Sequence, residues 1–251
     1  MKKKLIIFGL LAVIIVTFGF IGLKLAANGT EGNYFNRNLR GSFAQHPFFR
    51  EVLGLHYDGD AAADYLGQNF KTVVISVKVE AGVKTDEAVL RRFADKVAEI
   101  SGKPASFQID AGLISQKEAV EKTPAELADR YQKSRSKGQA AILNVLYLNT
   151  ASEDPKLLGS TLAEDGIILY KGALADFTAR NPATLPAYEY STLLHEFGHQ
   201  LGLSHNSFDN CLMSEHAEHM GTFIELPGDV ITDFCPEEYS QLHAKKTLFF
   251  H

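Results

Sequence analysis

Two histidines and a glutamate in the C-terminal third of the chain have the spacing of a hydrolytic zinc site. His195 and His199 are four positions apart, so on a helix both imidazoles project from one face, one turn apart. At that separation two ring nitrogens can bind one Zn²⁺ at ~2.0–2.1 Å. Glu196 lies about 100° around the helix from His195, where its carboxylate can accept a proton from a water molecule at the metal.

Gly202 and His205 follow at offsets that suit a third ligand. Because glycine adopts a positive φ without steric cost, Gly202 can end the helix and turn the backbone so that His205 returns to the metal. Three neutral nitrogen ligands leave a fourth position for water, as in catalytic rather than structural zinc sites. The alternative is that His205 is a loop histidine and that Glu218 or Glu225 is the third ligand, which leaves the glycine turn without a purpose.

These five residues resemble the extended zinc motif, HExxHxxGxxH, of the metzincin clan of metallopeptidases. Members of the clan also place a methionine in a tight turn beneath the zinc, and Met213 follows His205 by eight residues. The segment Cys211–Ser214 resembles the turn of the adamalysin-like and archaemetzincin-like branches. The resemblance implies that Met213 is an apolar support and not a ligand. It also implies that Gly166–Tyr170 is an edge strand above the zinc, along which an extended substrate binds.

Several residues depart from the better-known families of the clan. Asn206 stands where these families have an acidic or a small residue after the third histidine. Glu215, two positions after the methionine, replaces the tyrosine of astacin-like and serralysin-like members, so a tyrosine switch is not expected. His216 and His219 form a further His-x-x-His pair. We interpret this pair as solvent-exposed, because no acidic partner at suitable spacing completes a second metal site.

Cys211 and Cys235 are the only cysteines of the chain. In an exported protein such a pair can form a disulfide across a long loop. As free thiols they would be two small buried hydrophobic residues. Both interpretations stay open, because the sequence does not give the separation of the two Cα atoms. A second zinc site with four cysteines, as the archaemetzincin resemblance would imply, is excluded.

An uncharged apolar stretch, Leu5–Leu23, follows three lysines at the N-terminus. It is long enough for a transmembrane helix and longer than the ~7–15 apolar residues of a usual signal peptide. The nearest small-residue site has Leu25 where a small residue is preferred, which disfavours cleavage. We therefore expect a single-pass membrane protein with its catalytic domain outside the cytoplasm, or a secreted protein if the segment is cleaved.

The rest of the chain has the composition of an acidic globular domain. The 251 residues are 45% hydrophobic and 22% charged, which excludes a disordered protein. Without the four lysines of the N-terminal segment, the chain has 21 basic and 30 acidic residues, a net charge of −9. Because this part of the chain also has no lysine- or arginine-rich run, its composition argues against nucleic acid as the main partner.

The pattern of apolar residues predicts an α+β fold, a mixed α/β layer. We expect strands at 71–79, 105–109, 140–148 and 166–170, and helices at 85–100, 123–134 and 186–201, with a closing helix from Pro236. The resemblance makes this a zincin/metzincin-like catalytic domain with a twisted mixed sheet and an active-site helix, preceded by an N-terminal transmembrane helix. The predicted organisation is a membrane anchor or signal segment at 1–27, an irregular stalk at 28–68 and a zinc metallopeptidase domain at 69–251.

The expected function is that of a zinc-dependent endopeptidase that cleaves peptide bonds by Glu-assisted attack of a zinc-bound water. In this hypothesis Glu196 is catalytic, His195, His199 and His205 bind Zn²⁺, and the partners are a peptide or protein substrate and the membrane. One alternative is a catalytically inactive zincin-like scaffold, which the presence of Glu196 disfavours because a structural zinc needs no base. The other is a zinc exopeptidase, for which the sequence shows no group that grips a substrate terminus.

Overall fold

The computed structural model describes residues 2–30, 32–55, 57–132, 136–149, 154, 156–162, 166–208, 210–214 and 230–249, with side chains from residue 13 onward. The chain divides into two compact units, residues 1–56 and 57–251. The boundaries predicted from the sequence, after residues 27 and 68, stay a prediction. The second unit begins at Tyr57, ahead of the predicted start of the metallopeptidase domain.

The first unit is built of helices: α1 (Lys2–Ala27), α2 (Tyr34–Asn38), α3 (Arg40–Ala44) and α4 (Pro47–Leu53). A proline in the first turn of α4 and Gly54 at φ 65° after its end account for the bounds of that helix. The unit has its own small core of Ala27, Phe35, Ala44, Leu53 and Leu55. The region predicted to be irregular thus contains helices of five to seven residues, which are too short to show a helical period.

Within the part of the chain that the structure describes, no helix is both long and apolar enough to cross a membrane. The predicted N-terminal transmembrane helix over Leu5–Leu23, and with it the predicted single-pass membrane localisation, is therefore wrong.

In the described part of the second unit, a mixed six-stranded sheet forms the centre, with the strand order β2-β1-β4-β6-β5 and with β3 paired to β4. The strands are β1 (Thr72–Glu80), β2 (Ala105–Ile114), β3 (Ser136–Lys137), β4 (Ala140–Leu148), β5 (Gly159–Leu162) and β6 (Gly166–Tyr170). β1, β2, β4 and β6 are parallel, whereas β3 and β5 pair antiparallel with their neighbours. The predicted strands at 140–148 and 166–170 have the observed bounds, and the strand predicted at 105–109 continues to Ile114.

Among the described strands, β5 and not β6 lies at this edge of the sheet, and β2 lies at the other. β6 pairs with β4 on one side and with β5 on the other, for example at Ser160 opposite Ile168. The position expected for Gly166–Tyr170, at the edge above the metal, is therefore wrong, and Gly159–Leu162 occupies it. This strand has only four residues, Gly-Ser-Thr-Leu, so the sequence lacks the alternation by which a strand is recognised.

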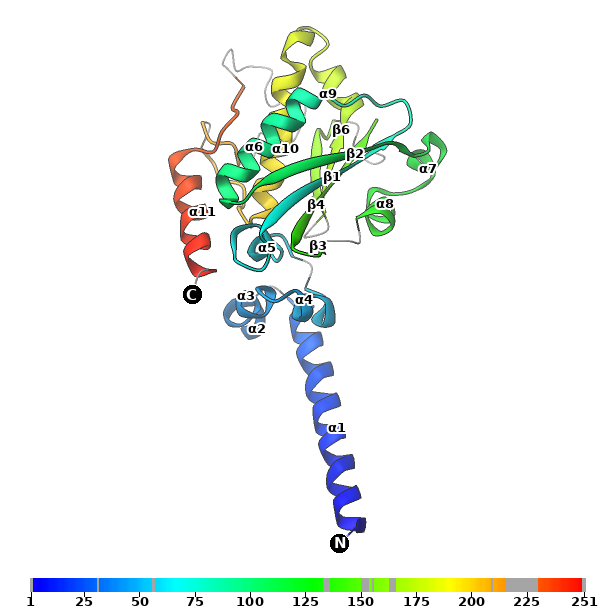
Figure 1. Ribbon diagram of the computed structural model, residues 1–251, viewed down its shortest axis with the longest axis vertical. Helices are drawn as coiled ribbons and strands as arrows, with labels where there is room; N and C mark the ends of the chain where they lie inside the picture. Colours follow the sequence, from blue (N-terminus) through cyan, green and yellow to red (C-terminus); the bar gives the residue numbers. More distant parts are fainter. Residues whose placement is uncertain are drawn as a thin grey trace. The chain divides into compact units, whose positions relative to one another are not determined.

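Helices cover both faces of this sheet (Figure 1). They are α5 (Ala62–Leu66), α6 (Glu87–Ser101), α7 (Gln116–Glu121), α8 (Pro124–Tyr131), α9 (Lys171–Phe177), α10 (Leu185–Gln200) and α11 (Pro236–Leu248), with a 3₁₀ turn at Pro182–Thr184. α6 and α10 lie on the face to which β1 points its buried residues, and α8 lies on the other (Figure 1). Phe197 of α10 packs against Phe93 of α6, with ring centroids 5.9 Å apart. The sheet and α6 thereby fix the position of α10.

Candidate metal centre

Helix α10 carries the first three residues of the motif in a fully buried setting. His195 and Glu196 are each 1% exposed. The start of the helix is held by Glu189, whose carboxylate accepts a hydrogen bond from the Tyr147 hydroxyl at 3.0 Å and pairs with Lys171. Burial raises the pKa of Glu189 above its ordinary value, although Lys171 beside it acts in the opposite direction. Glu189 thus joins α10 to Tyr147 of β4 and to Lys171 at the start of α9.

The helix ends where the sequence predicts. Gly202 has a φ of +78°, in the left-handed region that favours glycine, and the backbone turns there. A second glycine makes this turn possible, because a Cβ on Gly59 would lie 2.5 Å from the Cα of Gly202. The segment ahead of β1 thus crosses the helix end in direct backbone contact. No pattern in the sequence pointed to this contact.

The turn brings the third histidine to the other two. The Nε2 atom of His205 lies 3.2 Å from Nε2 of His195 and 3.1 Å from Nε2 of His199. The Nδ1 atoms of His195 and His199 lie 2.7 Å from the Leu212 carbonyl oxygen and 2.9 Å from that of Leu203. Because a carbonyl oxygen only accepts, each Nδ1 carries the proton, and in the neutral ring Nε2 keeps its lone pair.

This donor set fits zinc. Bonds of ~2.0–2.1 Å in tetrahedral geometry place neighbouring ligand nitrogens about 3.3–3.4 Å apart, close to the observed separations. Carbonyl groups that fix the outer nitrogen of a metal-binding imidazole are a regular feature of such sites. Glu218 and Glu225, the alternative third ligands, lie outside the described residues, as do Glu215, His216 and His219.

Glu196 is held by the edge strand. The Thr161 hydroxyl of β5 lies 2.8 Å from the Glu196 Oε2 atom and 2.9 Å from the Glu196 carbonyl oxygen, so it can donate to either. Gly159 allows this approach, because a Cβ there would lie 2.5 Å from Thr192 Cγ2 and 3.1 Å from Glu196 Oε1. Sequence reasoning missed Thr161 and Gly159, since they lie on a strand that carries no sequence signal.

A cleft of about 470 Å³ opens between β5 and the end of α10. It is lined by Asp58, Leu157, Gly159, Ser160, Thr161, His199, Gly202, Leu203, Ser204 and His205. Two of the three histidines and the residue that holds Glu196 therefore face one open space. A substrate in this cleft would lie between the edge strand and the candidate metal site.

Met213 lies against the helix on the side of its histidines. Its side chain is fully buried, and a Cβ on Gly198 would lie 2.4 Å from its sulfur. The neighbouring Leu212 carbonyl accepts from His195, so the turn that holds the methionine also orients a histidine. A disulfide between Cys211 and Cys235 joins this turn to the start of α11. Of the two interpretations of the cysteines, the structure has the disulfide.

Replacing Gly198 by alanine should destabilise the protein by about 1–3 kcal/mol, because the new methyl group overlaps the buried Met213 side chain. Alanine would otherwise favour the helix over glycine by ~1 kcal/mol. Urea unfolding of the metal-free protein measures the change. Gly41→Ala in α3 is the matched control, since no atom lies within 4 Å of its added Cβ, and it should be neutral or stabilising. A stabilised Gly198→Ala variant would contradict the tight packing of Met213.

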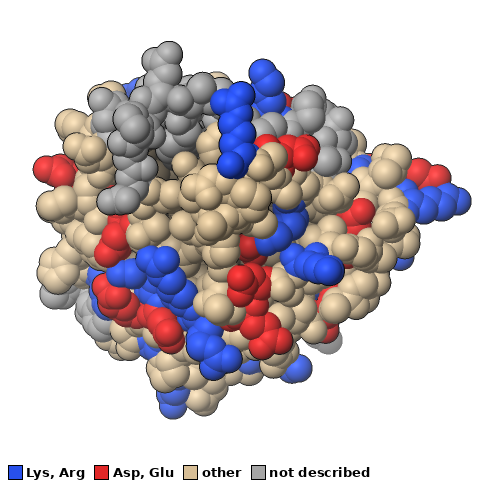
Figure 2. Space-filling view, turned by 90° about the horizontal axis from the view of Figure 1, so that it is seen from above, with Lys and Arg blue, Asp and Glu red and all other residues tan. Residues whose placement is uncertain are grey.

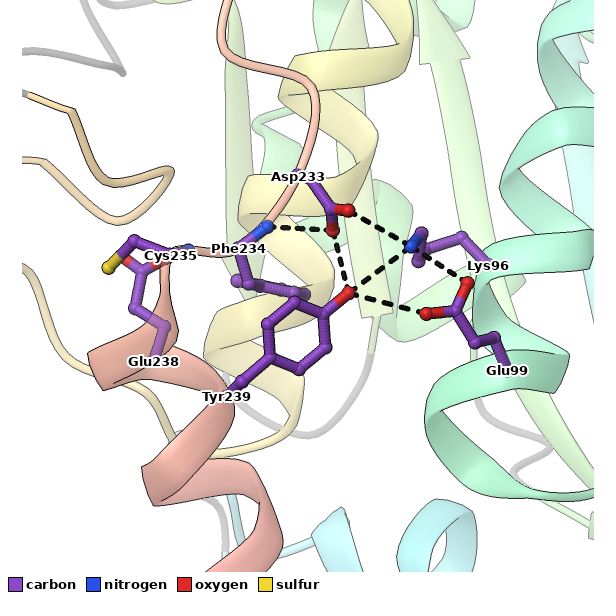
Figure 3. Close-up of polar contacts among 7 residues, drawn as sticks. All are labelled: Lys96, Glu99, Asp233, Phe234, Cys235, Glu238 and Tyr239. Carbon is purple, nitrogen blue, oxygen red and sulfur yellow. Dashed lines mark hydrogen bonds and ion pairs between the residues drawn. The ribbon is translucent and has the colours of Figure 1, made fainter.

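A polar network fixes the start of α11 on α6 (Figure 3). Lys96 donates to Asp233 and to the Tyr239 hydroxyl at 3.3 and 3.2 Å, and it pairs with Glu99 at 2.8 Å. Tyr239 donates to Asp233 at 2.7 Å. Burial and the hydrogen bond to Asp233 raise the pKa of Tyr239 to about 12. Burial works to raise the pKa of Asp233, but hydrogen bonds from Tyr239, Lys96 and the backbone leave it below its ordinary value.

The change Asp233→Asn should lower the free energy of unfolding at pH 7 by less than about 1 kcal/mol, because the carboxylate is half exposed and screened. A lowered folded-state pKa means that the carboxylate stabilises the fold above its ordinary pKa of 3.8 and loses this effect as the pH falls through the folded-state value. The difference between variant and wild type should therefore shrink below pH 3.8.

Urea unfolding at pH 7 and at acid pH measures this difference. The exposed Asp95 on α6 supplies the control, because Asp95→Asn should change the stability at neither pH. A stability loss in Asp233→Asn that stayed constant down to the lowest pH would show that the ion pair is not its cause.

Comparison with known proteins places the site in context. Residues 119–213, which include the three histidines, Glu196 and Met213, match the family model of zincin-like metallopeptidases. No curated protein sequence matches the chain. The archaemetzincin of Methanopyrus kandleri is similar in structure, with a TM-score of 0.52 and 15% identity over 70% of this chain and 97% of that one. The mixed α/β fold predicted for the catalytic domain agrees with this similarity.

Two further solved structures are more distant. The archaemetzincin of Archaeoglobus fulgidus, complexed with malonate, has a TM-score of 0.45 and 16% identity, over 67% of this chain and 99% of that one. The zinc-dependent peptidase of Methanocorpusculum labreanum has a TM-score of 0.42 and 15% identity, over 67% and 99% of the two chains.

Proposed function

We propose that this zincin-like protein is a zinc-dependent endopeptidase, in which His195, His199 and His205 bind the ion and Glu196 is the general base. The observation that carries the proposal is the convergence of three Nε2 atoms: that of His205 lies 3.2 and 3.1 Å from those of His195 and His199 on α10. The same helix also carries the buried carboxylate of Glu196. A zinc ion held there would lower the pKa of a water molecule and polarise the scissile carbonyl group.

Glu196 would move the proton in this reaction. Because it directly follows His195 on α10, about 100° around the helix, we expect its carboxylate to lie beside the three nitrogens rather than among them. The Thr161 hydroxyl holds one of its oxygens. From this position the carboxylate can accept the proton of the attacking water and return it to the leaving amine. The structural scaffold alternative gives no role to a carboxylate held in this way.

The substrate would bind along the outer edge of β5. Among the described strands, β5 pairs with β6 only, so an extended peptide would pair with its other edge. Main-chain hydrogen bonds to such an edge need no free terminus, which favours cleavage within a chain. A zinc exopeptidase is the alternative, because Asp58 lines the same cleft and a carboxylate there could bind a terminal ammonium group.

Nucleic acid is not part of the proposal. On the face that Figure 2 shows, basic and acidic side chains of the described residues are interspersed. The acidic net charge of the chain points in the same direction.

A peptide blocked at both ends separates the candidate functions. An internally quenched peptide with an N-acetyl group and a C-terminal amide should be cleaved by the zinc-loaded protein. A chelator should stop the cleavage, and added Zn²⁺ should restore it. Cleavage of a free-ended peptide but not of the blocked one would favour the exopeptidase. Stoichiometric zinc without cleavage of either peptide, or of a denatured protein, would favour the scaffold.

A further inference from the structure

Glu238, in the first turn of α11, is a buried carboxylate surrounded by nitrogen donors; it is 1% exposed. Its Oε1 atom accepts from the Met213 backbone N–H at 2.7 Å and from the Asn206 Nδ2 group at 2.8 Å. Its Oε2 atom accepts from the backbone N–H groups of Leu212 at 3.2 Å and of Cys235 at 2.9 Å. Figure 3 shows Glu238 next to Cys235 at the start of the helix.

This arrangement requires a carboxylate. Each oxygen faces two donors, so neither position can be taken by a group that carries a hydrogen. A glutamine would direct its NH₂ group at two N–H donors and leave both without an acceptor. The hydrogen bond from the Cys235 N–H is the usual one of a capping box, in which a glutamate at the third helical position accepts from the N-cap residue. The other three donors belong to segments that carry or orient the histidines.

Two of those contacts lead directly to the metal centre. Leu212 donates its backbone N–H to Glu238, and its carbonyl oxygen accepts from Nδ1 of His195. Asn206, which donates its side-chain amide to Glu238, directly follows His205 in the chain. Its backbone N–H donates to the Met213 carbonyl oxygen at 2.8 Å. The asparagine that departs from the better-known metzincin families is therefore a donor to Glu238. An acidic residue there would oppose the glutamate.

We propose that Glu238 is a positioning residue of the metal centre, which sets the distance between the His195 and His205 imidazoles by holding the Leu212–Met213 turn and Asn206 on one carboxylate. The inference rests on the proposed function in that it takes the three histidines as the ligands. The proposal adds the first turn of α11, which follows the histidine motif and Met213 in the sequence, to the metal centre.

The role is separate from the attachment of α11 itself. The disulfide between Cys211 and Cys235 joins the helix start to the turn covalently. The Lys96–Asp233–Tyr239 network fixes the same start on α6 (Figure 3). With these contacts intact, loss of the carboxylate would release the alignment of the two segments around the metal and leave the helix in place.

The test is Glu238→Gln in the 251-residue chain, with Glu237→Gln as the matched control. Glu237 lies in the same turn of α11 with an exposed side chain, so its replacement removes an equal charge from the helix start. Three quantities are measured: the Kd for Zn²⁺ by chelator competition, the visible spectrum of the Co²⁺-substituted protein and the Tm of the metal-free protein. We expect Glu238→Gln to bind Zn²⁺ about 10–100-fold more weakly and to change the Co²⁺ spectrum, and Glu237→Gln to do neither.

An unchanged Kd and Co²⁺ spectrum in Glu238→Gln, with only the Tm lowered, would overturn the proposal, since the role would then be structural. If the variant does not fold, Asn206→Ala decides, because it removes one donor on a partly exposed residue and leaves three backbone donors. Weaker Zn²⁺ binding in Asn206→Ala supports the proposal, and unchanged binding overturns it. Because no readout uses peptide cleavage, a wild type that binds zinc without cleaving peptides would refute the proposed function alone.

Discussion

The variant Glu196→Gln should fold, bind one zinc ion as tightly as the wild type and hydrolyse peptides at least about a hundredfold more slowly. Glutamine has nearly the same shape, and its carbonyl oxygen can still accept from the Thr161 hydroxyl, which lies 2.8 Å from Oε2 in the wild type. The three histidines are unchanged. What is lost is the group that accepts the proton of the attacking water, a contribution of typically ~10²–10⁴-fold.

The measurement is kcat/KM on the doubly blocked peptide, together with the zinc content of the same preparation. Glu237→Gln, an exposed glutamate in α11, should retain full activity and excludes a general effect of lost charge. Near-normal cleavage by zinc-loaded Glu196→Gln would show that another group is the base, even if the histidines bind the metal.

The variant His205→Ala should lose zinc binding and activity together. It removes the nitrogen that lies 3.2 and 3.1 Å from the other two and leaves two ligands in a site beside an open cleft. Two histidines do not hold Zn²⁺ tightly where water competes. The affinity should fall by more than the ~10–100-fold expected for a residue that only orients a ligand. Zinc content after dialysis and the Kd from chelator competition are the measurements.

His243 supplies the control, because it is an exposed histidine on α11 and His243→Ala should leave both quantities unchanged. Full zinc content and turnover in His205→Ala would remove this histidine from the ligand set. The third ligand would then have to be sought among the downstream glutamates. Whereas Glu196→Gln tests the rate of hydrolysis with zinc bound, His205→Ala tests zinc binding itself.

The relations within one element could be predicted from the sequence. His195 and His199 share a face because a helix repeats every ~3.6 residues, and no other part of the chain is needed to bring them together. Gly202 is at a positive φ because the chain turns there, as its place in the motif predicts. The strand at 140–148 is apolar except for Asn144, as expected for a parallel strand buried on both faces.

Prediction from the sequence is wrong where the same residue pattern is compatible with more than one structural environment. An apolar run at the N-terminus predicts a transmembrane helix by its length and hydropathy alone, and no such helix is found among the described residues. The sequence predicts the strand at 166–170 but not its place in the sheet, because the residues of a strand do not determine which strands pair with it.

The contacts that complete the site come from tertiary structure only. Thr161 reaches Glu196 across 35 positions of the chain, and Glu238 reaches Met213 and Asn206 across 25 and 32 positions. Neither Thr161 nor Glu238 belongs to a recognisable motif, since threonine and glutamate are ordinary residues on a surface. Their roles arise because packing removes them from water and directs their polar atoms at the histidine-bearing segments, where each buried donor must find an acceptor. Local periodicity thus determines which side chains could bind a metal, and the packing of distant segments decides how they are held.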